Sequence, residues 1–226
     1  MKKLFALLLA LLMVTTCFTG CFGKKDDVSD DSQSVSDSVV DDTEDTGEEV
    51  SDNTVNEDSA KYTVDIELSE SNPDAETNDV ATADIAAAVK ELLGESYLPS
   101  MPLDNEFLEM TYGVKPEWID NFYAEMPMIG FHPDVFIAVK AAEGQADNVE
   151  AALNDYLDYS KEGAIQYPAN LPKVNAARVY RLGNYVFYIL LAAVPEEYMD
   201  NEEGAFDFSV ESNQNVVNKI NELLIK

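Results

Sequence analysis

The stretch Val186-Phe187-Tyr188-Ile189-Leu190-Leu191 is apolar at successive positions. Because neighbouring side chains of a strand point to opposite faces of its sheet, this pattern predicts a strand that is central and buried on both faces. Gly183-Asn184 separates it from a second apolar run, residues 177–182. A Gly-Asn pair between apolar runs favours a two-residue turn, so residues 177–182 and 185–193 should form a β-hairpin.

A second hairpin is predicted upstream, between residues 119–129 and the apolar run 135–141. Pro127 has no N–H to donate to a ladder, so the first of these strands should lie at an edge or be bulged there. Residues 118–123 are also compatible with a helix. Residues 62–68 alternate between polar and apolar side chains and predict a short additional edge strand.

Apolar residues recur at three- and four-residue spacing around the hairpins, which predicts amphipathic helices. The predicted helices run from Asp79 or Thr82 to Gly94, from the N-cap Asp104 to Gly113, through Val149, Ala152, Leu153, Tyr156 and Leu157, and through Val216, Val217, Ile220, Leu223 and Leu224. The order helix, hairpin, helix, hairpin, helix predicts an α+β fold. We expect an antiparallel sheet of two hairpins with the helices packed on one face.

The N-terminus has the layout of an export signal. Lys2 and Lys3 are followed by an uncharged apolar stretch at residues 4–14, and then by small and polar residues up to Gly20. The apolar stretch is about half of the roughly 20 residues that a membrane-spanning helix needs. We therefore expect residues 1–20 to be a signal peptide.

The end of this signal, Phe18-Thr19-Gly20-Cys21, resembles the lipobox of bacterial lipoproteins, with Phe18 in place of the usual leucine. The resemblance implies that the Cys21 thiol receives a diacylglycerol and that a peptidase cuts directly before it. Two acyl chains give a stable membrane anchor, whereas one binds marginally. A second frame ending at Cys17, and an unmodified Cys21 after a plain signal, are the alternatives. With Cys21 lipidated and Cys17 removed, the mature chain would have no thiol for a disulfide, a metal bond or nucleophilic catalysis.

The charge distribution divides the chain. It carries 44 Asp and Glu against 14 Lys and Arg, which excludes electrostatic binding of nucleic acid. Fourteen of the acids lie in residues 22–60, among Ser, Thr and scattered Val. Such a composition cannot bury enough apolar surface to offset chain entropy, so residues 21–61 should form a disordered acidic tether behind the lipidated Cys21. Residues 62–226 should form the α+β domain.

The sequence offers few groups for catalysis or metal binding. His132 is the only histidine, and no nucleophile elbow, His-Glu-x-x-His motif or phosphate-binding Gly loop occurs. We therefore expect no enzyme activity, no cofactor and no metal site. A carboxylate-dependent hydrolase is the alternative, because two acids at a suitable separation suffice for glycoside hydrolysis.

Met and aromatic side chains gather around the turn of the first hairpin. Met126, Met128, Phe131 and His132 are candidates for a binding surface, because Met and aromatic side chains suit adaptable contacts. Packing in the core is the alternative interpretation. An apolar groove beside residues 126–128 would favour binding, a cleft with converging acids would favour hydrolysis, and neither would favour an assembly role.

Five short segments occur in the predicted domain: Leu98 to Asp104, Tyr112-Gly113-Val114, Met126 to His132, Val135 to Lys140, and the turn Gly183-Asn184-Tyr185. Together with the lipobox and the acidic spacer, they resemble a family of Gram-positive, mostly clostridial, lipoproteins that share a C-terminal domain of unknown function, family 4358. The resemblance covers roughly residues 83–193. It implies a location at the cell surface but no activity and no site residue.

Taken together, these features predict a lipoprotein that is anchored through lipid in the cell membrane on its extracytoplasmic face. Its domain should bind an extracellular protein, a wall component or a small ligand. An extracellular carboxylate-dependent hydrolase and a structural or assembly lipoprotein are the alternative functions.

Overall fold

The computed structural model describes residues 66–226. The predicted signal peptide 1–20, Cys21 and the predicted tether 21–61 lie outside the described residues, and so do the first residues of the predicted domain 62–226.

The described part contains a five-stranded sheet in which every neighbouring pair is antiparallel, in the order β1-β2-β3-β5-β4. The strands are β1 (Met101–Pro102), β2 (Ile119–Met126), β3 (Val135–Ala141), β4 (Arg178–Leu182) and β5 (Tyr185–Leu190). Both predicted hairpins, β2–β3 and β4–β5, are confirmed. They join through β3 and β5, which pair from Val135 opposite Leu190 to Lys140 opposite Tyr185.

The centre of the sheet has no polar face. All residues of β5 are buried, and their side chains alternate between two separate cores. Val186, Tyr188 and Leu190 pack into the core on one face, whereas Phe187 and Ile189 pack into the core on the other. The apolar run that predicted a central strand therefore supplies both cores at once.

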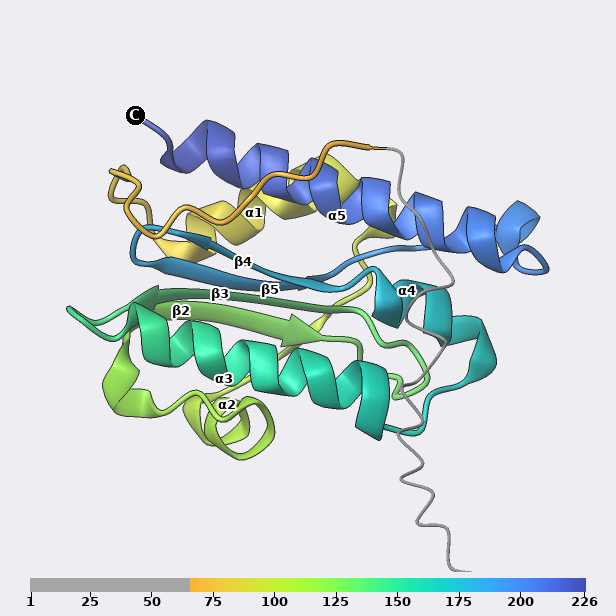
Figure 1. Cartoon of the computed structure of the whole chain (residues 1–226), viewed down its shortest axis with the longest axis horizontal. Coiled ribbons are helices and arrows are strands. Elements are labelled where there is room, and N and C mark those ends of the chain that lie inside the picture. The colour runs from red at the N-terminus through yellow and green to blue at the C-terminus, as the bar shows by residue number, and fades with distance from the viewer. Residues whose placement is uncertain (1–65) are drawn as a thin grey trace, which may run out of the picture. The chain divides into compact units, whose positions relative to one another are not determined.

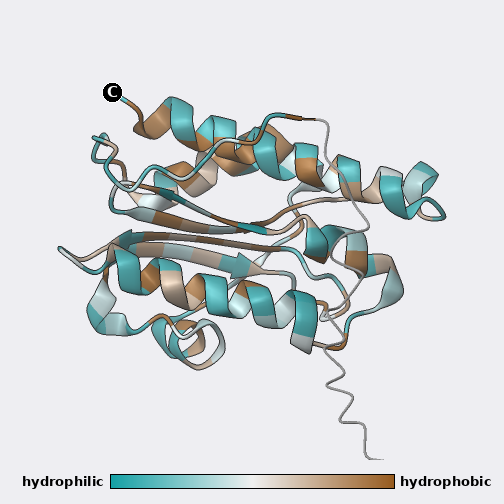
Figure 2. Ribbon diagram, in the orientation of Figure 1, coloured by the Kyte–Doolittle hydropathy of each residue, from teal (hydrophilic) through white to brown (hydrophobic). Residues whose placement is uncertain are grey.

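Helices cover both faces of the sheet (Figure 1). The α-helices are α1 (Thr82–Leu93), α2 (Asn105–Tyr112), α3 (Ala146–Asp158), α4 (Leu171–Asn175) and α5 (Glu202–Leu224). α2 and α3 cover one face and α1 and α5 cover the other, with their brown apolar stripes turned toward the strands in Figure 2. The α+β antiparallel class is confirmed, but the placement of the helices on one face is wrong. A strand that is apolar on both faces needs a helical layer on each.

The predicted helix boundaries follow local chemistry. α1 ends at Gly94, and α2 begins after Asp104, whose Oδ1 accepts a hydrogen bond from the Phe107 N–H at 2.9 Å. Gly113 ends α2 with a left-handed φ of 70°. β2 starts directly after a 3₁₀ turn at Pro116–Trp118, so the helical alternative for residues 118–123 is wrong. β2 is bulged near Ile119 rather than at Pro127, which follows its last residue.

The predicted strand at residues 62–68 is wrong over its described part, since Ile66 to Leu68 form no strand. The segment from Ser69 onward instead runs along the outer edge of β4. Asn72 N–H donates to the Arg181 carbonyl at 2.9 Å, and Gly183 N–H donates to the Asn72 carbonyl at 2.9 Å. These bonds satisfy groups of an edge strand that would otherwise be open to pairing with another chain.

This edge segment makes Gly183 sensitive to substitution. Gly183 has φ of 56°, and a Cβ there would lie 2.7 Å from the Ala75 carbonyl oxygen. Gly144 has φ of 73° with nothing near its Cβ position. We expect Gly144→Ala to lower the free energy of unfolding by about 1–2 kcal/mol through backbone strain alone. Gly183→Ala should lower it by about 1–3 kcal/mol more, because the edge segment must also move. Urea unfolding of both variants measures the difference, and equal losses would contradict the close packing of residues 69–77 on the turn.

Candidate functional site

A cavity of about 510 Å³ opens at the end of the sheet where β3 begins and β5 ends. We call it the end cavity. It is lined by Leu98, Phe131, His132, Pro168, Ala169, Asn170, Pro172, Lys173, Ala193, Val194, Tyr198, Met199, Glu202 and Ala205. The walls thus come from Leu98 before β1, from the β2–β3 loop, from residues 168–173, and from the chain between β5 and the first turn of α5. In Figure 1, α4 lies at this end of the sheet, between the two helical layers.

Local sequence explains why the chain forms walls here rather than more sheet. Pro168 begins a 3₁₀ turn and Pro172 lies in the first turn of α4, positions where a missing N–H costs nothing. Asn170 Nδ2 donates to the Phe131 carbonyl at 2.7 Å, which ties this segment to the β2–β3 loop. Beyond β5, Leu191 N–H donates to Asn213 Oδ1 at 2.9 Å, so a side chain of α5 takes the place of a neighbouring strand.

A buried ion pair anchors the end cavity from within. Asp134 is fully buried, and its Oδ2 accepts a hydrogen bond from the Lys173 ammonium, which is itself nearly buried. Asp134 Oδ1 accepts from the Ala192 N–H at 3.0 Å. One carboxylate therefore joins the β2–β3 loop, α4 and the chain leaving β5. The positive charge of Lys173 is matched inside the protein.

The four residues predicted as a binding surface separate in the structure. Phe131 and His132 line the end cavity. Met126 and His132 line a smaller cavity of about 190 Å³ that lies against the α2–α3 face, which we call the tyrosine cavity. Met128 is 76% exposed and lines neither. His132 thus belongs to both cavities, and the predicted surface is partly cavity wall and partly open loop.

The tyrosine cavity takes its name from Tyr112, Tyr156 and Tyr188 in its wall. The Tyr112 and Tyr156 rings are 4.3 Å apart between centroids, and the Tyr156 and Tyr188 rings are 5.5 Å apart. Burial raises the pKa of all three phenols above the ordinary value, so they stay protonated at physiological pH. Their arrangement provides neutral hydrogen-bonding groups in an aromatic wall rather than a base.

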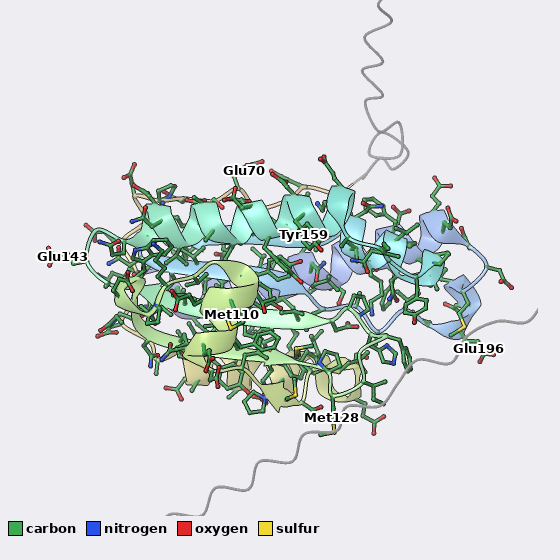
Figure 3. The ribbon with its side chains drawn as sticks, turned by 90° about the horizontal axis from the view of Figure 1, so that it is seen from below. Glu70, Met110, Met128, Glu143, Tyr159 and Glu196 are labelled. Atoms are coloured by element: carbon green, nitrogen blue, oxygen red, sulfur yellow. The ribbon has the colours of Figure 1, made fainter. Side chains whose placement is uncertain are left out.

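A third hollow lies between α2 and α3, with Met110 and Tyr159 in its lining and also in view in Figure 3. Its volume is again about 510 Å³, but it is more open to solvent than the end cavity. The end cavity is lined by four chain segments, and most of its lining residues are apolar. We therefore take the end cavity as the candidate site.

Sequence reasoning missed most of the lining residues. Val194, Tyr198 and Met199 come from a stretch without clear helical or strand periodicity. The one usable signal was the Pro-interrupted stretch at residues 168–172, which lies between a helix and a strand and marks a loop.

The described residues show neither a metal centre nor a membrane span. Within residues 66–226, no three His, Cys, Asp or Glu side chains are placed to hold a metal ion. In the same range, no helix combines the length and the apolar character needed to cross a bilayer. Among the described residues that line the end cavity, Glu202 is the only carboxylate.

Residues 94–191 match the model of a family described as a domain of unknown function (DUF4358). The match runs from the end of α1 to just past β5, and so includes the whole sheet, α2 and α3. It confirms the resemblance to that domain family, which the sequence predicted over roughly residues 83–193. No curated protein and no solved structure matches the chain.

The ion pair behind the end cavity gives a stability prediction. Lys173→Met leaves the Asp134 carboxylate buried without its cation, and we expect it to lower the free energy of unfolding by about 3–5 kcal/mol. The matched control is Lys219→Met, which removes the exposed i,i+3 partner of Glu222 and should cost less than about 1 kcal/mol. Denaturant unfolding at neutral pH compares the two. Equal losses would mean that the buried pair does not anchor this end of the sheet.

Proposed function

We propose that this chain is an extracytoplasmic lipoprotein, held at the cell membrane by lipid on Cys21, whose folded domain binds a ligand or partner through the end cavity. The end cavity is the observation that supports the proposed binding role. Its volume of about 510 Å³ falls in the range of small-molecule sites, roughly 300–1,000 Å³.

The chemistry of the cavity walls supports binding. Most lining side chains are apolar, and Phe131 and Met199 supply aromatic and thioether surface that accommodates varied shapes. A few lining residues are polar, among them His132, Asn170 and Tyr198. Apolar walls with a small number of placed polar groups are typical of sites that bind and orient a ligand.

The cavity also favours binding over the two alternative functions. A carboxylate-dependent hydrolase needs two acids facing the reacting bond, whereas Glu202 is the single carboxylate among the described lining residues. An assembly role would not require an enclosed apolar cavity.

The membrane anchor rests on the sequence. The signal at residues 1–20 is followed by Cys21 and then by Lys24 and Lys25, which anionic head groups attract by roughly 1 kcal/mol each. The acids that follow are repelled by the same head groups. The predicted tether would therefore hold the domain away from the bilayer, with the end cavity accessible to extracellular molecules.

Cys21→Ala tests the anchor. In a Gram-positive host, we expect the variant to be released into the medium or to remain uncleaved, because no thiol is left to acylate at the cleavage site. Phase partition in detergent and intact mass of the N-terminal peptide measure the outcome. Cys17→Ala is the matched control and should leave acylation and membrane retention intact. A correctly cleaved Cys21→Ala protein that stays in the membrane would contradict the proposed anchor.

Photo-crosslinking tests the cavity. Small apolar fragments that carry a diazirine should label the intact protein at residues 127–134, 165–173 and 194–205, as read by peptide mass spectrometry. Val194→Trp places a large ring into the cavity from a half-buried position and should reduce this labelling several-fold. Circular dichroism confirms that the variant folds. Labelling concentrated around Met110 and Tyr159, or unchanged by Val194→Trp, would place binding elsewhere.

A further inference from the structure

The wall formed by residues 194–205 is strongly acidic. It carries Glu196, Glu197, Asp200, Glu202 and Glu203, all exposed, and its sequence contains no Lys or Arg. Of these acids, only Glu202 lines the cavity, and the other four belong to the exposed stretch beside it. Glu202 and Glu203 lie in the first turn of α5, where they also stabilise the helix dipole. The other three precede α5, and Glu196 and Glu197 begin the 3₁₀ turn Glu196–Tyr198. We call this stretch the acidic wall.

The remaining walls do little to offset this charge. Lys173, the one Lys or Arg among the described lining residues, is paired with the buried Asp134. The β2–β3 loop contributes His132, and residues 168–172 contribute no charged side chain. The exposed stretch beside the end cavity is therefore rich in acids and contains no Lys or Arg, within a chain whose formal net charge is -30. Fields of this kind concentrate cations and repel anions.

Exposed apolar side chains extend the contact surface beyond the cavity. Phe131 is 53% exposed and Met199 is 71% exposed, and both lie at the cavity. Tyr167 and Leu171 are also exposed and flank lining residues in sequence. A ligand that filled only the cavity would leave this rim uncovered. A chain that crosses the mouth would cover the rim and reach the acidic wall.

We propose that the end cavity receives an apolar side chain of a basic peptide segment, whose Lys and Arg residues lie over the acidic wall. This inference rests on the proposed binding function of the end cavity and names the class of partner. The apolar side chain provides the affinity, because its transfer from water into the cavity is favourable. The negative charge of the acidic wall favours basic over acidic peptides and speeds their association. This electrostatic contribution weakens as the salt concentration rises.

Three peptides with one apolar core test the proposal: acetyl-Lys-Lys-Leu-Phe-Lys-Lys-amide and the versions with Ser or Glu in place of every Lys. The lipidated protein is held in phosphatidylcholine nanodiscs, and calorimetry gives the dissociation constants, with empty nanodiscs as the blank. We expect the Lys peptide to bind about tenfold more tightly than the Ser peptide at low ionic strength, and the Glu peptide to bind most weakly. The preference should shrink in 0.5 M NaCl, where the Debye length falls to about 4 Å.

Paired charge variants locate the effect. Glu196→Gln with Glu197→Gln should reduce the preference for the Lys peptide several-fold. Glu117→Gln with Glu143→Gln removes the same charge and should leave the preference unchanged. In Figure 3, Glu143 lies at the opposite end of the described part from Glu196. Glu117 and Glu143 are both exposed. This comparison is needed because the predicted tether is acidic too and would attract a basic peptide by itself.

The outcomes separate this inference from the proposed function. Equal binding of the Lys and Ser peptides, lost in both cases with Val194→Trp, would overturn the basic class and leave the cavity as a binding site. Binding of the Lys peptide that neither Val194→Trp nor the Glu196/Glu197 variant weakens would overturn the inference, since the tether would then be the binding element. Absence of binding by all three peptides would also overturn it, while fragment labelling of the cavity still decides the proposed function.

Discussion

The fold depends on the burial of β5 on both faces. A strand with apolar side chains on alternate sides cannot leave either face in water, so each face needs its own helical layer. α2 and α3 supply one layer, and α1 and α5 supply the other. β3 lies beside β5 and is buried in the same way, apart from the half-buried Lys140. The described residues therefore form three layers, with the sheet between two layers of helices.

The end cavity is a consequence of that layering. At the end of the sheet where β5 stops, α4 lies between the two helical layers. The N–H groups of Leu191 and Ala192 are satisfied by Asn213 and Asp134, which turns the chain away from the sheet. Because side chains take over from the ladder there, the space between the layers is not filled by a continuing strand. The cavity therefore lies where side chains, rather than a neighbouring strand, accept the hydrogen bonds of the Leu191 and Ala192 N–H groups.

Local sequence signals predict most of the helices and strands, but they do not predict the end cavity. The Gly183-Asn184 turn and the Asp104 cap depend on neighbours in sequence, and both were predicted. The apolar sequence of β5 also implies the second helical layer, but this inference requires both faces of β5 to be considered together. α5 begins at Glu202, after the cap Asn201 and well before the apolar residues that predicted it. Its earlier turns bury Phe206 and Val210 as well as the hydrogen-bonded amide of Asn213. A buried, hydrogen-bonded amide has no hydrophobic signature in sequence. The end cavity is built from four segments that meet only in the folded chain, so Phe131 and His132 could be named and Tyr198 and Met199 could not.

The distribution of the few basic residues connects the fold to the charge of the cavity. Lys90 in α1 pairs with Glu125 in β2 at 2.9 Å, and Arg181 in β4 pairs with Glu150 in α3 at 2.8 Å. Lys173 in α4 pairs with Asp134 in the β2–β3 loop. Each of these bases joins two elements that are distant in sequence, and each lies where partial burial makes a charge pair matter more than it would on the open surface. These three bases lie outside the acidic wall, whose residues 194–205 contain no Lys or Arg. These Lys and Arg residues connect the layers through ion pairs. Because they lie at these positions and not in the acidic wall, the surface beside the end cavity is acidic.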